Sequence, residues 1–226
     1  MADAAPLEWS LWRYRHAAAW LTREARAGAR LADVGCGQGN VLAHLAAVTP
    51  IRDWTAIDVD AAALAATARR VPCATVHASI LDAPRLAGLA RGFDFVILGD
   101  VLHHLVARTR AGSRRLAERA LASAAGLLAP RGTLLIVEPT LAPRFAATLA
   151  FHAKRLLAGV VRRRLELGAP WANLGPPIVS LYDRRQIERF VAATPELTIL
   201  AREQEASGRV AGLTRGRLTI VARRAE

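Results

Sequence analysis

Short apolar runs alternate with segments of helical periodicity along the first two thirds of the chain. The apolar runs have the length of strands and cover residues 30–34, 54–57, 74–77, 93–98 and 134–137. The helical segments between them cover residues 41–48, 61–70 and 114–128. The run at 93–98 is almost wholly apolar, as expected of a strand that is buried on both faces of a sheet. This alternation predicts βαβ units and therefore an α/β fold with a mainly parallel sheet.

A long amphipathic helix is predicted over residues 143–167. Its large apolar residues recur at helical spacing on one side and are Phe145, Leu149, Leu156 and Val160. Its basic end carries Arg162, Arg163 and Arg164. We expect the apolar side to pack on the domain while the arginines face water, and a peripheral contact of 143–167 with an anionic membrane is the alternative. His152 is expected to be structural or to face a lid.

The end of the chain follows a different pattern. Asp183 is a suitable N-cap for a helix over residues 184–193. Residues 197–202 and 217–222 are strand-like, and a glycine-containing loop at 203–216 joins them, which predicts a terminal β-hairpin. The expected fold is thus a Rossmann-like, doubly wound α/β domain whose mainly parallel seven-stranded sheet ends in an antiparallel hairpin.

The glycine turn at residues 35–39 is the most informative segment of the sequence. It joins a predicted strand to a predicted helix, where glycines allow positive φ and the helix N-terminus offers free N–H groups. The next strand ends at Asp58, whose carboxylate can accept hydrogen bonds from both hydroxyls of a ribose. The glycines run GxGxG, and Asn40 stands where the dinucleotide-binding fingerprint GxGxxG has its third glycine. This spacing argues against a nicotinamide-dependent oxidoreductase.

The stretch DVGCGQG at residues 33–39 resembles the first motif of the class I S-adenosylmethionine-dependent methyltransferases. Further stretches resemble later motifs of that family in the same order: AIDVD at 56–60, ASILD at 78–82, FDFVILGDVLHHL at 93–105 and LLAPRGTL at 127–134. The motif at 93–105 is similar to that of the small-molecule, quinone-biosynthesis-like branch. The resemblance runs from about residue 31 to residue 138 and implies S-adenosylmethionine as methyl donor, with S-adenosylhomocysteine as product.

Carried over position by position, the resemblance implies a cofactor site. Its three glycines would wrap the methionine part, Asp58 would hold the ribose, Ile80 would pack on adenine, and Gly99 and Asp100 would lie near the sulfonium. The implied cofactor-binding set is Asp33, Gly35, Cys36, Gly37, Gly39, Asp58, Val59, Ser79, Ile80, Gly99 and Asp100. Ser79 departs from the aspartate that is common at its position, so either Ser79 or Asp82 is expected to accept from the adenine amine.

Two neighbouring histidines, His103 and His104, follow the fourth strand at the edge where open α/β sheets bind ligands. Histidine titrates near neutral pH, so either could be a base or could position the acceptor. Asp100 and Glu138 are the alternatives. We expect no metal site, and Cys73, which precedes the third strand, is expected to be structural.

Composition bears mainly on partners and location. The chain has 226 residues and a net charge of +12, and Lys154 is its only lysine. The arginines are expected to form a solvated surface, with an acidic partner as the alternative. The start of the chain has no signal-peptide pattern, and the two cysteines form no CxxC pair, so a cytoplasmic protein is expected, with membrane contact at most peripheral.

We expect one methyltransferase domain over residues 1–226. Its parts would be a helical lid (1–28), a cofactor core (29–139), a cap insertion (140–182), and a C-terminal helix with the hairpin (183–226). The expected reaction is methyl transfer to a small hydrophobic or amphipathic acceptor, with O-methylation favoured. The alternatives are a nucleic-acid methyltransferase, an NAD(P)-dependent oxidoreductase, and a catalytically silent binding protein. The sequence predicts no oligomeric state.

Overall fold

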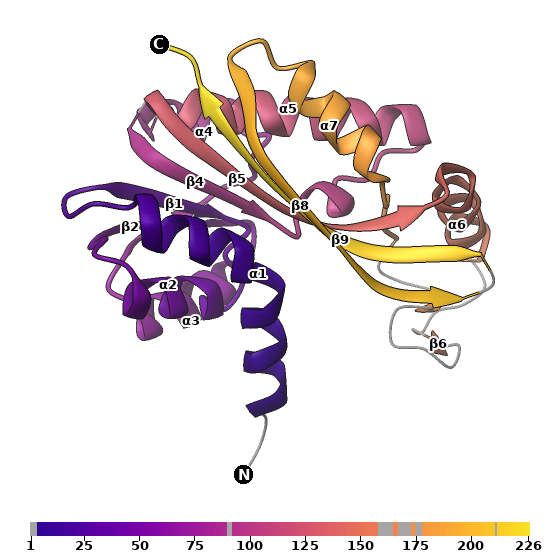
Figure 1. Ribbon diagram of the computed structural model, residues 1–226, viewed down its shortest axis with the longest axis horizontal. Helices are drawn as coiled ribbons and strands as arrows, with labels where there is room; N and C mark the ends of the chain where they lie inside the picture. Colours follow the sequence, from indigo (N-terminus) through magenta and orange to yellow (C-terminus); the bar gives the residue numbers. More distant parts are fainter. Residues whose placement is uncertain (1–3, 90–91, 158–164, 167–172, 175–177, 211) are drawn as a thin grey trace.

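The computed structural model describes residues 4–89, 92–157, 165–166, 173–174, 178–210 and 212–226, without the side chains of residues 4–11, 157, 165–166, 173–174 and 210. The helices are α1 (Ala4–Glu24), α2 (Asn40–Val48), α3 (Ala61–Arg70), α4 (Ala83–Leu86), α5 (Arg110–Leu127), α6 (Arg144–Leu157) and α7 (Arg184–Ala192) (Figure 1). The strands are β1 (Arg30–Val34), β2 (Asp53–Asp58), β3 (Ala74–His77), β4 (Phe93–Gly99), β5 (Leu128–Ala142), β6 (Leu165–Glu166), β7 (Asn173–Leu174), β8 (Leu197–Val210) and β9 (Leu213–Arg224). Short 3₁₀ turns, η1 (Ala87–Leu89) and η2 (Leu102–His104), follow α4 and β4.

A seven-stranded sheet forms the centre of the molecule, in the order β3-β2-β1-β4-β5-β9-β8. The first five of these strands are parallel, and β9 and β8 pair antiparallel with their neighbours. The predicted fold class is therefore confirmed. Since β1 lies between β2 and β4, the loops that follow these three strands meet at one edge of the sheet.

Helices cover both faces of the sheet (Figure 1). Buried side chains of α1, α2 and α3 pack on one face, and those of α5 and α7 pack on the other. Most residues of β1, β2 and β4 are buried because both faces of these strands are covered in this way, whereas the edge strand β3 is largely exposed. Helix α5 begins at Arg110, earlier than the expected residue 114, because the Thr109 side chain caps it by accepting from Gly112 N.

The C-terminal hairpin is longer than the sequence suggested. Residues 203–210 and 213–216, expected within a loop, continue β8 and β9, and these strands pair from Leu197↔Arg224 to Val210↔Leu213. Strand β5, expected over 134–137, likewise runs on to Ala142 and pairs with β9 as far as Thr214. The prediction was wrong here because many residues of this part of the hairpin are charged, so the segment lacks the apolar pattern of a strand. The backbone hydrogen bonds that pair the two strands do not depend on the hydropathy of the side chains.

The helix expected over 143–167 ends at Leu157 within the described residues. Leu165 and Glu166 instead form β6, which pairs antiparallel with β7 in a separate two-stranded sheet. The expected continuation was therefore wrong at its C-terminal end. Val160 and the three arginines at 162–164 lie outside the described residues.

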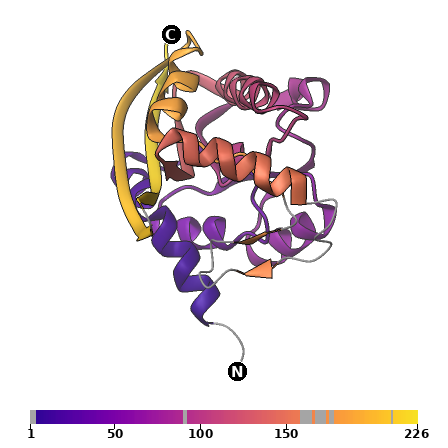
Figure 2. The same cartoon turned by 90° about the vertical axis from the view of Figure 1, so that its right-hand side faces the viewer.

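The apolar side of α6 is turned toward solvent, contrary to the expectation that it packs on the domain. Phe145, Leu149 and Leu156 are 69%, 68% and 80% exposed. The helix is held instead by Ala146, Ala147 and Phe151, which are buried. Figure 2 shows α6 lying across the end of the molecule that the extended hairpin reaches.

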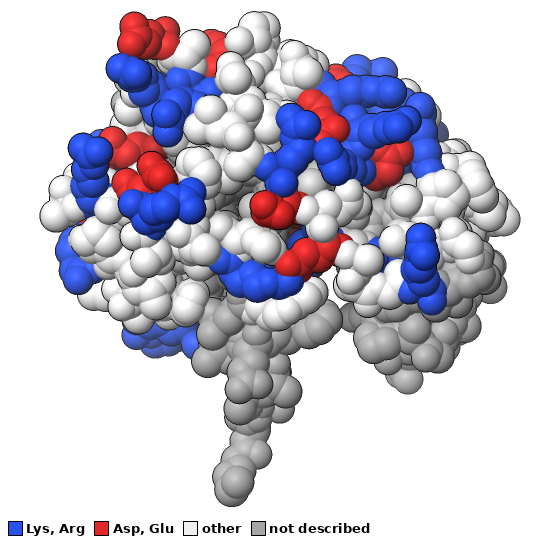
Figure 3. All heavy atoms as spheres, in the orientation of Figure 1, with Lys and Arg blue, Asp and Glu red and all other residues white. Residues whose placement is uncertain are grey.

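Basic side chains gather on the face shown in Figure 3, over the region of α7 and β8. Arg184 and Arg202 there pair with Glu188. Within the part of the chain that the structure describes, no helix is long and apolar enough to cross a membrane.

Candidate active site

A cavity of about 490 Å³ opens at the carboxyl ends of β1, β2 and β4. It is lined by Val34, Gly35, Ile57, Asp58, Val59, Ala78, Ser79, Ile80, Asp100, Val101, His104 and Leu105. Seven of the residues expected at the site are thus brought together: Gly35, Asp58, Val59, Ser79, Ile80, Asp100 and His104. Asp33, Cys36, Gly37, Gly39, Gly99 and His103 do not line this cavity.

The glycine turn has the backbone conformation that its sequence predicts. Gly35, Gly37 and Gly39 all have positive φ, at 74°, 53° and 77°. A Cβ at Gly35 would lie 2.4 Å from Val101 Cγ2, and one at Gly39 would lie 2.9 Å from Thr67 Cα. A Cβ at Gly37 would meet no atom within 4 Å. Two of the glycines therefore allow close packing within the protein, and Gly37 faces open space.

Asp58 is fixed at the end of β2 by two backbone donors. Its Oδ2 accepts from Gly37 N and its Oδ1 accepts from Asp60 N, both at 2.9 Å. A carboxylate offers about four acceptor positions, so each oxygen keeps a lone pair for a further donor. The side chain is thus oriented before any ligand binds, and it can still accept from two hydroxyls.

Asp33 lies beneath the glycine turn and is only 4% exposed. Burial, and to a lesser extent the charge of Asp58, raise the pKa of its carboxyl to about 7. Cys36 Sγ points away from the cavity, toward Thr67 Oγ1 on α3 at 3.7 Å. Burial raises the pKa of this thiol to about 12, so it is not a nucleophile at neutral pH.

The wall between β3 and α4 contains Ser79 and Ile80. Ile80 is 4% exposed and gives the cavity an apolar surface. Ser79 Oγ accepts from Leu81 N at 3.2 Å. Asp82, the alternative partner for adenine, caps α4 and pairs with Arg85 Nε at 3.3 Å, and it does not line the cavity. The geometry therefore favours Ser79 over Asp82 as the polar group at this wall.

Asp100 follows β4 in a left-handed conformation, with φ 56°. Its Oδ1 accepts from Arg217 Nη1 at 2.8 Å, and its Oδ2 accepts from Arg13 Nη1 at 3.2 Å and from the Tyr14 hydroxyl at 3.4 Å. Tyr14 also packs against Gly99, where a Cβ would lie 2.2 Å from the tyrosine oxygen. Helix α1 and strand β9 thus meet at the end of β4.

The two histidines of η2 point to different places. His103 is 8% exposed, and its Nδ1 lies 2.8 Å from Glu138 Oε2. Glu138 Oε1 also accepts from Val101 N and Leu102 N, at 2.7 and 2.6 Å. His104 lines the cavity, and burial together with the neighbouring His103 lowers its pKa, although Asp100 acts in the opposite direction. His104 is therefore neutral at pH 7, which leaves a ring nitrogen able to accept a proton.

Helix α6 lies near the same edge of the sheet. Arg155 Nη1 donates to the carbonyl of Ala107 at 3.3 Å, in the loop that follows η2. The guanidinium carbon Cζ of Arg110 lies over the ring of Phe151, 5.8 Å from the ring centroid. Arg110 in turn donates to Ser180 Oγ and to the carbonyl of Leu181. The helix is thus anchored beside the turn that carries His104.

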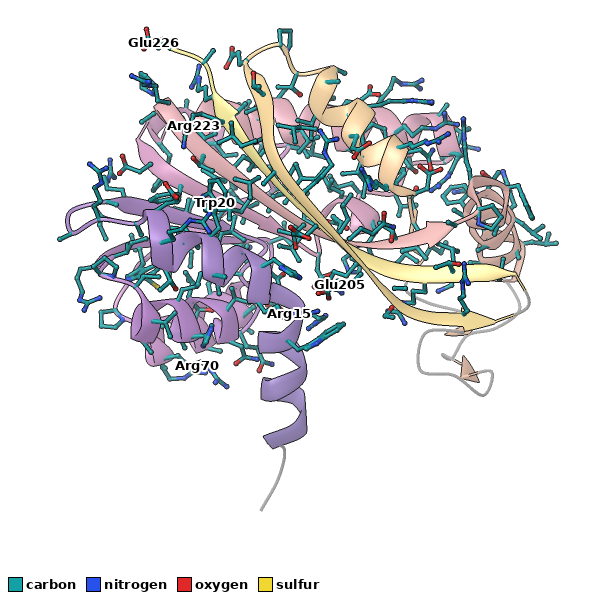
Figure 4. All side chains as sticks on the ribbon, viewed as in Figure 1. Arg15, Trp20, Arg70, Glu205, Arg223 and Glu226 are labelled. Atoms are coloured by element: carbon teal, nitrogen blue, oxygen red, sulfur yellow. The ribbon has the colours of Figure 1, made fainter. Side chains whose placement is uncertain are left out.

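Sequence reasoning missed the basic residues around Asp100. Arg13 lies on α1, next to Tyr14, and Arg217 lies on β9. Both are therefore distant from Asp100 in the sequence. The alternation of Arg215 and Arg217 along a strand, which places both on one face, was the available signal. Figure 4 shows a second link between α1 and the hairpin, where Arg15 points toward Glu205 of β8.

Residues 32–134 match the family model described as a methyltransferase domain. This match over just under half of the chain, together with the fold, supports the class I S-adenosylmethionine-dependent methyltransferase family. A curated relative, an uncharacterised methyltransferase of Mycobacterium bovis, is 37% identical to this chain over 108 residues. The match covers 46% of this chain and 48% of the relative, so the chain spans about half the length of that protein.

Solved structures of low sequence identity share the whole fold. The N-methyltransferase NodS from Bradyrhizobium japonicum is 20% identical, with a TM-score of 0.60 and coverage of 100% of both chains. The magnesium protoporphyrin IX methyltransferase of Synechocystis, solved with bound S-adenosylhomocysteine, is 16% identical, with a TM-score of 0.63 and coverage of 96% of this chain and 83% of that one. The fold of these two methyltransferases is therefore similar to that of this chain outside residues 32–134 as well.

Proposed function

We propose that this protein transfers a methyl group from S-adenosylmethionine to a small, hydrophobic or amphipathic acceptor, releasing S-adenosylhomocysteine. The observation that carries the proposal is the single cavity that joins Asp58, the adenine-side wall at Ile80 and the turn at Asp100–His104. Its volume of about 490 Å³ lies within the range of about 300–1,000 Å³ that is usual for sites of small molecules and cofactors. The resemblance to methyltransferases suggests the reaction, and the cavity suggests where in the molecule it takes place.

The residues present fit this cofactor. Asp58 has lone pairs available for the ribose hydroxyls, Ile80 offers an apolar surface to adenine, and Gly37 leaves room for the methionine part. S-adenosylmethionine supplies the methyl group on a sulfonium centre that is already reactive. What the chain contributes is orientation of donor and acceptor, a role that is worth several kcal/mol of the barrier.

His104 is the proposed proton acceptor. It lines the cavity, and its lowered pKa keeps the ring neutral at physiological pH. A hydroxyl acceptor must lose its proton as the bond to the methyl carbon forms, so a neutral imidazole at this wall favours O-methylation. His103 is a positioning residue, because its ring is directed at Glu138 rather than at the cavity.

Helix α6 is proposed to bind the apolar part of the acceptor, within a cap formed by residues 140–182. Its exposed surface includes Phe145, Leu149 and His152, which border an open depression. Exposed apolar side chains on a helix that is anchored beside the His104 turn suit an acceptor with a hydrophobic portion. Residues 1–28 are proposed to act as the lid, since Tyr14 of α1 contacts Gly99 and Asp100.

Calorimetric titration with S-adenosylhomocysteine tests the cofactor assignment. Asp58→Ala should weaken binding by about 1.5–3 kcal/mol, the usual contribution of hydrogen bonds to a charged group. Asp53→Ala, at the opposite end of the same strand, is the matched control and should bind normally. Tight binding of NADH with no response to S-adenosylhomocysteine would overturn the proposal.

Transfer of labelled methyl groups tests the acceptor class. Incubation with total RNA, with DNA and with a metabolite extract should place the label in the small-molecule fraction. The motif after β4 is of the small-molecule type, and the arginine-rich surface is the observation that favours nucleic acid instead. Label that appears mainly in RNA would make the arginine surface the acceptor-binding face.

A further inference from the structure

A second cavity lies outside the candidate active site, where the end of β5 meets the first turns of α6 and α7. Its volume is about 490 Å³. Three arginines line it, Arg144 of α6 and Arg184 and Arg185 of α7, and we call it the basic pocket. None of its lining residues lines the cavity that contains Asp58 and His104. The basic pocket is thus separate from the proposed cofactor site.

The two carboxylates that line the basic pocket already have partners. Asp183 Oδ1 caps α7 by accepting from Gln186 N at 2.8 Å. Glu188 Oε1 accepts from Arg184 Nε at 2.8 Å and lies 3.6 Å from Nε of Arg202, which comes from β8. Glu188 is therefore shared between two guanidiniums, and Asp183 is used by the helix backbone.

Arg144 and Arg185 have no such acidic partner. Among the residues that the structure describes, no carboxylate oxygen lies within ion-pair distance of either guanidinium. Both side chains are exposed, and they come from two different helices that border the same cavity. Two guanidiniums thus line the basic pocket with N–H donors that no described carboxylate accepts.

Further positive charge lies close to the basic pocket. Arg110 is 5% exposed, and burial lowers the pKa of its guanidinium. The like charges of Arg114 and Arg144 lower this pKa too, while Tyr182 and Asp183 act in the opposite direction. Arg144 is thus near enough to Arg110 for their charges to repel. The positive charge around the basic pocket therefore exceeds what its two carboxylates offset.

An apolar depression adjoins the basic pocket along α6. Phe145 and Leu149 line this depression, and Arg144 lines both hollows. The other end of α6 lies beside the turn after β4, because Arg155 donates to the carbonyl of Ala107. A ligand can therefore place a charged end at Arg144 and an apolar chain on the exposed side of the same helix.

We propose that the basic pocket binds a phosphate group. A phosphate monoester carries about −1.5 to −2 charges at neutral pH and has three strong acceptor oxygens. Guanidiniums offer paired N–H donors in a planar fork that matches two oxygens of a phosphate. Forks that approach from both α6 and α7 suit three oxygens that point in different directions better than the two coplanar oxygens of a carboxylate.

Two sources share this chemistry. One is a phosphorylated amphipathic acceptor, whose apolar chain would lie on Phe145 and Leu149, and this source rests on the proposed function. The other is a free phosphate compound that binds independently of the acceptor. Octyl phosphate and inorganic phosphate distinguish the two sources, because only octyl phosphate carries an apolar chain.

The experiment is calorimetric titration of the full chain and of its variants with both probes. Arg144→Gln and Arg185→Gln each remove one guanidinium and leave the ion pairs of Glu188 in place. Arg69→Gln removes one charge at the end of α3, on the opposite face of the sheet, and is the control. Phe145→Ala removes the apolar contact and leaves the arginines. Thermal unfolding of each variant shows that it is folded before binding is compared.

Arg144→Gln and Arg185→Gln should each bind both probes about tenfold more weakly or worse, and Arg69→Gln should bind normally. If the acceptor carries the phosphate, octyl phosphate should bind at least about tenfold more tightly than inorganic phosphate, and Phe145→Ala should remove that difference. If the source is a free phosphate compound, the two probes should bind alike, and Phe145→Ala should change neither affinity.

The proposal is overturned if the unsubstituted protein binds neither probe, or if the pocket variants bind both probes as Arg69→Gln does. Binding of total RNA without binding of either probe would also overturn it, since the basic surface would then serve nucleic acid. S-adenosylhomocysteine should bind all variants normally and reports separately on the proposed function. Its failure to bind the unsubstituted protein would overturn that function, while the phosphate site would still be judged by the arginine variants.

Discussion

Glu138 and His103 form a buried pair behind the candidate active site, with 2.8 Å between Glu138 Oε2 and His103 Nδ1. The other carboxylate oxygen accepts from two consecutive backbone N–H groups of the turn after β4. One side chain of the fifth strand thus fixes both the shape of η2 and the orientation of its first histidine. His104, the second histidine, is left facing the cavity.

Replacing Glu138 with glutamine should therefore destabilise the protein. The amide keeps the volume but loses the charge, so the two backbone N–H groups of the turn and the His103 ring lose a charged acceptor. We expect the free energy of unfolding to fall by about 2–3 kcal/mol in urea denaturation. Glu226→Gln, whose side chain is 82% exposed, should be neutral, and an unchanged Glu138→Gln midpoint would contradict the role given to this carboxylate.

His104→Asn should slow methyl transfer to a hydroxyl acceptor without weakening S-adenosylhomocysteine binding. In the unsubstituted protein the pKa of His104 is lowered by burial, so its neutral form persists below the usual histidine value of about 6.5. The rate should therefore stay level through neutral pH and decline only in more acidic solution. His44→Asn, on α2 and away from the cavity, is the control. A pH profile that His104→Asn leaves unaltered would exclude His104 as the base.

Asp33 should make the protein less stable as pH rises. Its pKa is raised from 3.8 to about 7, so the folded state holds a proton that the unfolded state has released between these values. Since the folded state binds more protons there, the free energy of unfolding falls from about pH 4 to about pH 7. Asp33→Asn should remove this slope and be more stable at neutral pH by roughly 2–4 kcal/mol. Urea midpoints at about pH 5 and about pH 8 measure both effects, and equal slopes in the two proteins would refute the assignment.

Substitution of the two phenylalanines of α6 should affect the free energy of unfolding to very different extents. Phe145 is 69% exposed, so Phe145→Ala should change stability by less than about 0.5 kcal/mol. Phe151 is 1% exposed, so Phe151→Ala should cost about 3–5 kcal/mol. If α6 binds the acceptor, Phe145→Ala should raise the acceptor KM and leave cofactor affinity unchanged. Full turnover of an apolar acceptor by Phe145→Ala at an unchanged KM would exclude that role.

The sequence predicted the parallel strands closely, most directly at β4, where burial on both faces leaves an almost continuous apolar run. The strands at 30–34 and 74–77 and the helix at 61–70 have the predicted bounds. The N-cap at Asp183 is also confirmed, since its side chain accepts from Gln186 N within a capping box. These features depend on residues that are close in sequence, or on burial that nearly every fold of this class would impose.

The remaining features depend on which distant groups meet. Periodicity showed that one side of α6 is apolar, but it could not show that Phe151 and two alanines, rather than Phe145 and Leu149, face the domain. The two histidines of η2 are equivalent in the sequence, and only the position of Glu138 separates them. Arg13 and Arg217, which both donate to Asp100, come from opposite ends of the chain, so local patterns could not show that they meet.

The chain leaves the central sheet at Ala142 and returns to it at Tyr182, beside the strand it left. Leu141 N donates to the carbonyl of Tyr182 at 3.0 Å, and Thr140 and Tyr182 form a parallel bridge. Everything from 143 to 181 is thus an excursion whose two ends are already joined, and changing its length adds little loop-closure entropy. If this segment binds the acceptor as proposed, evolution or protein engineering can exchange it as a module and alter acceptor choice, while the strand order stays the same.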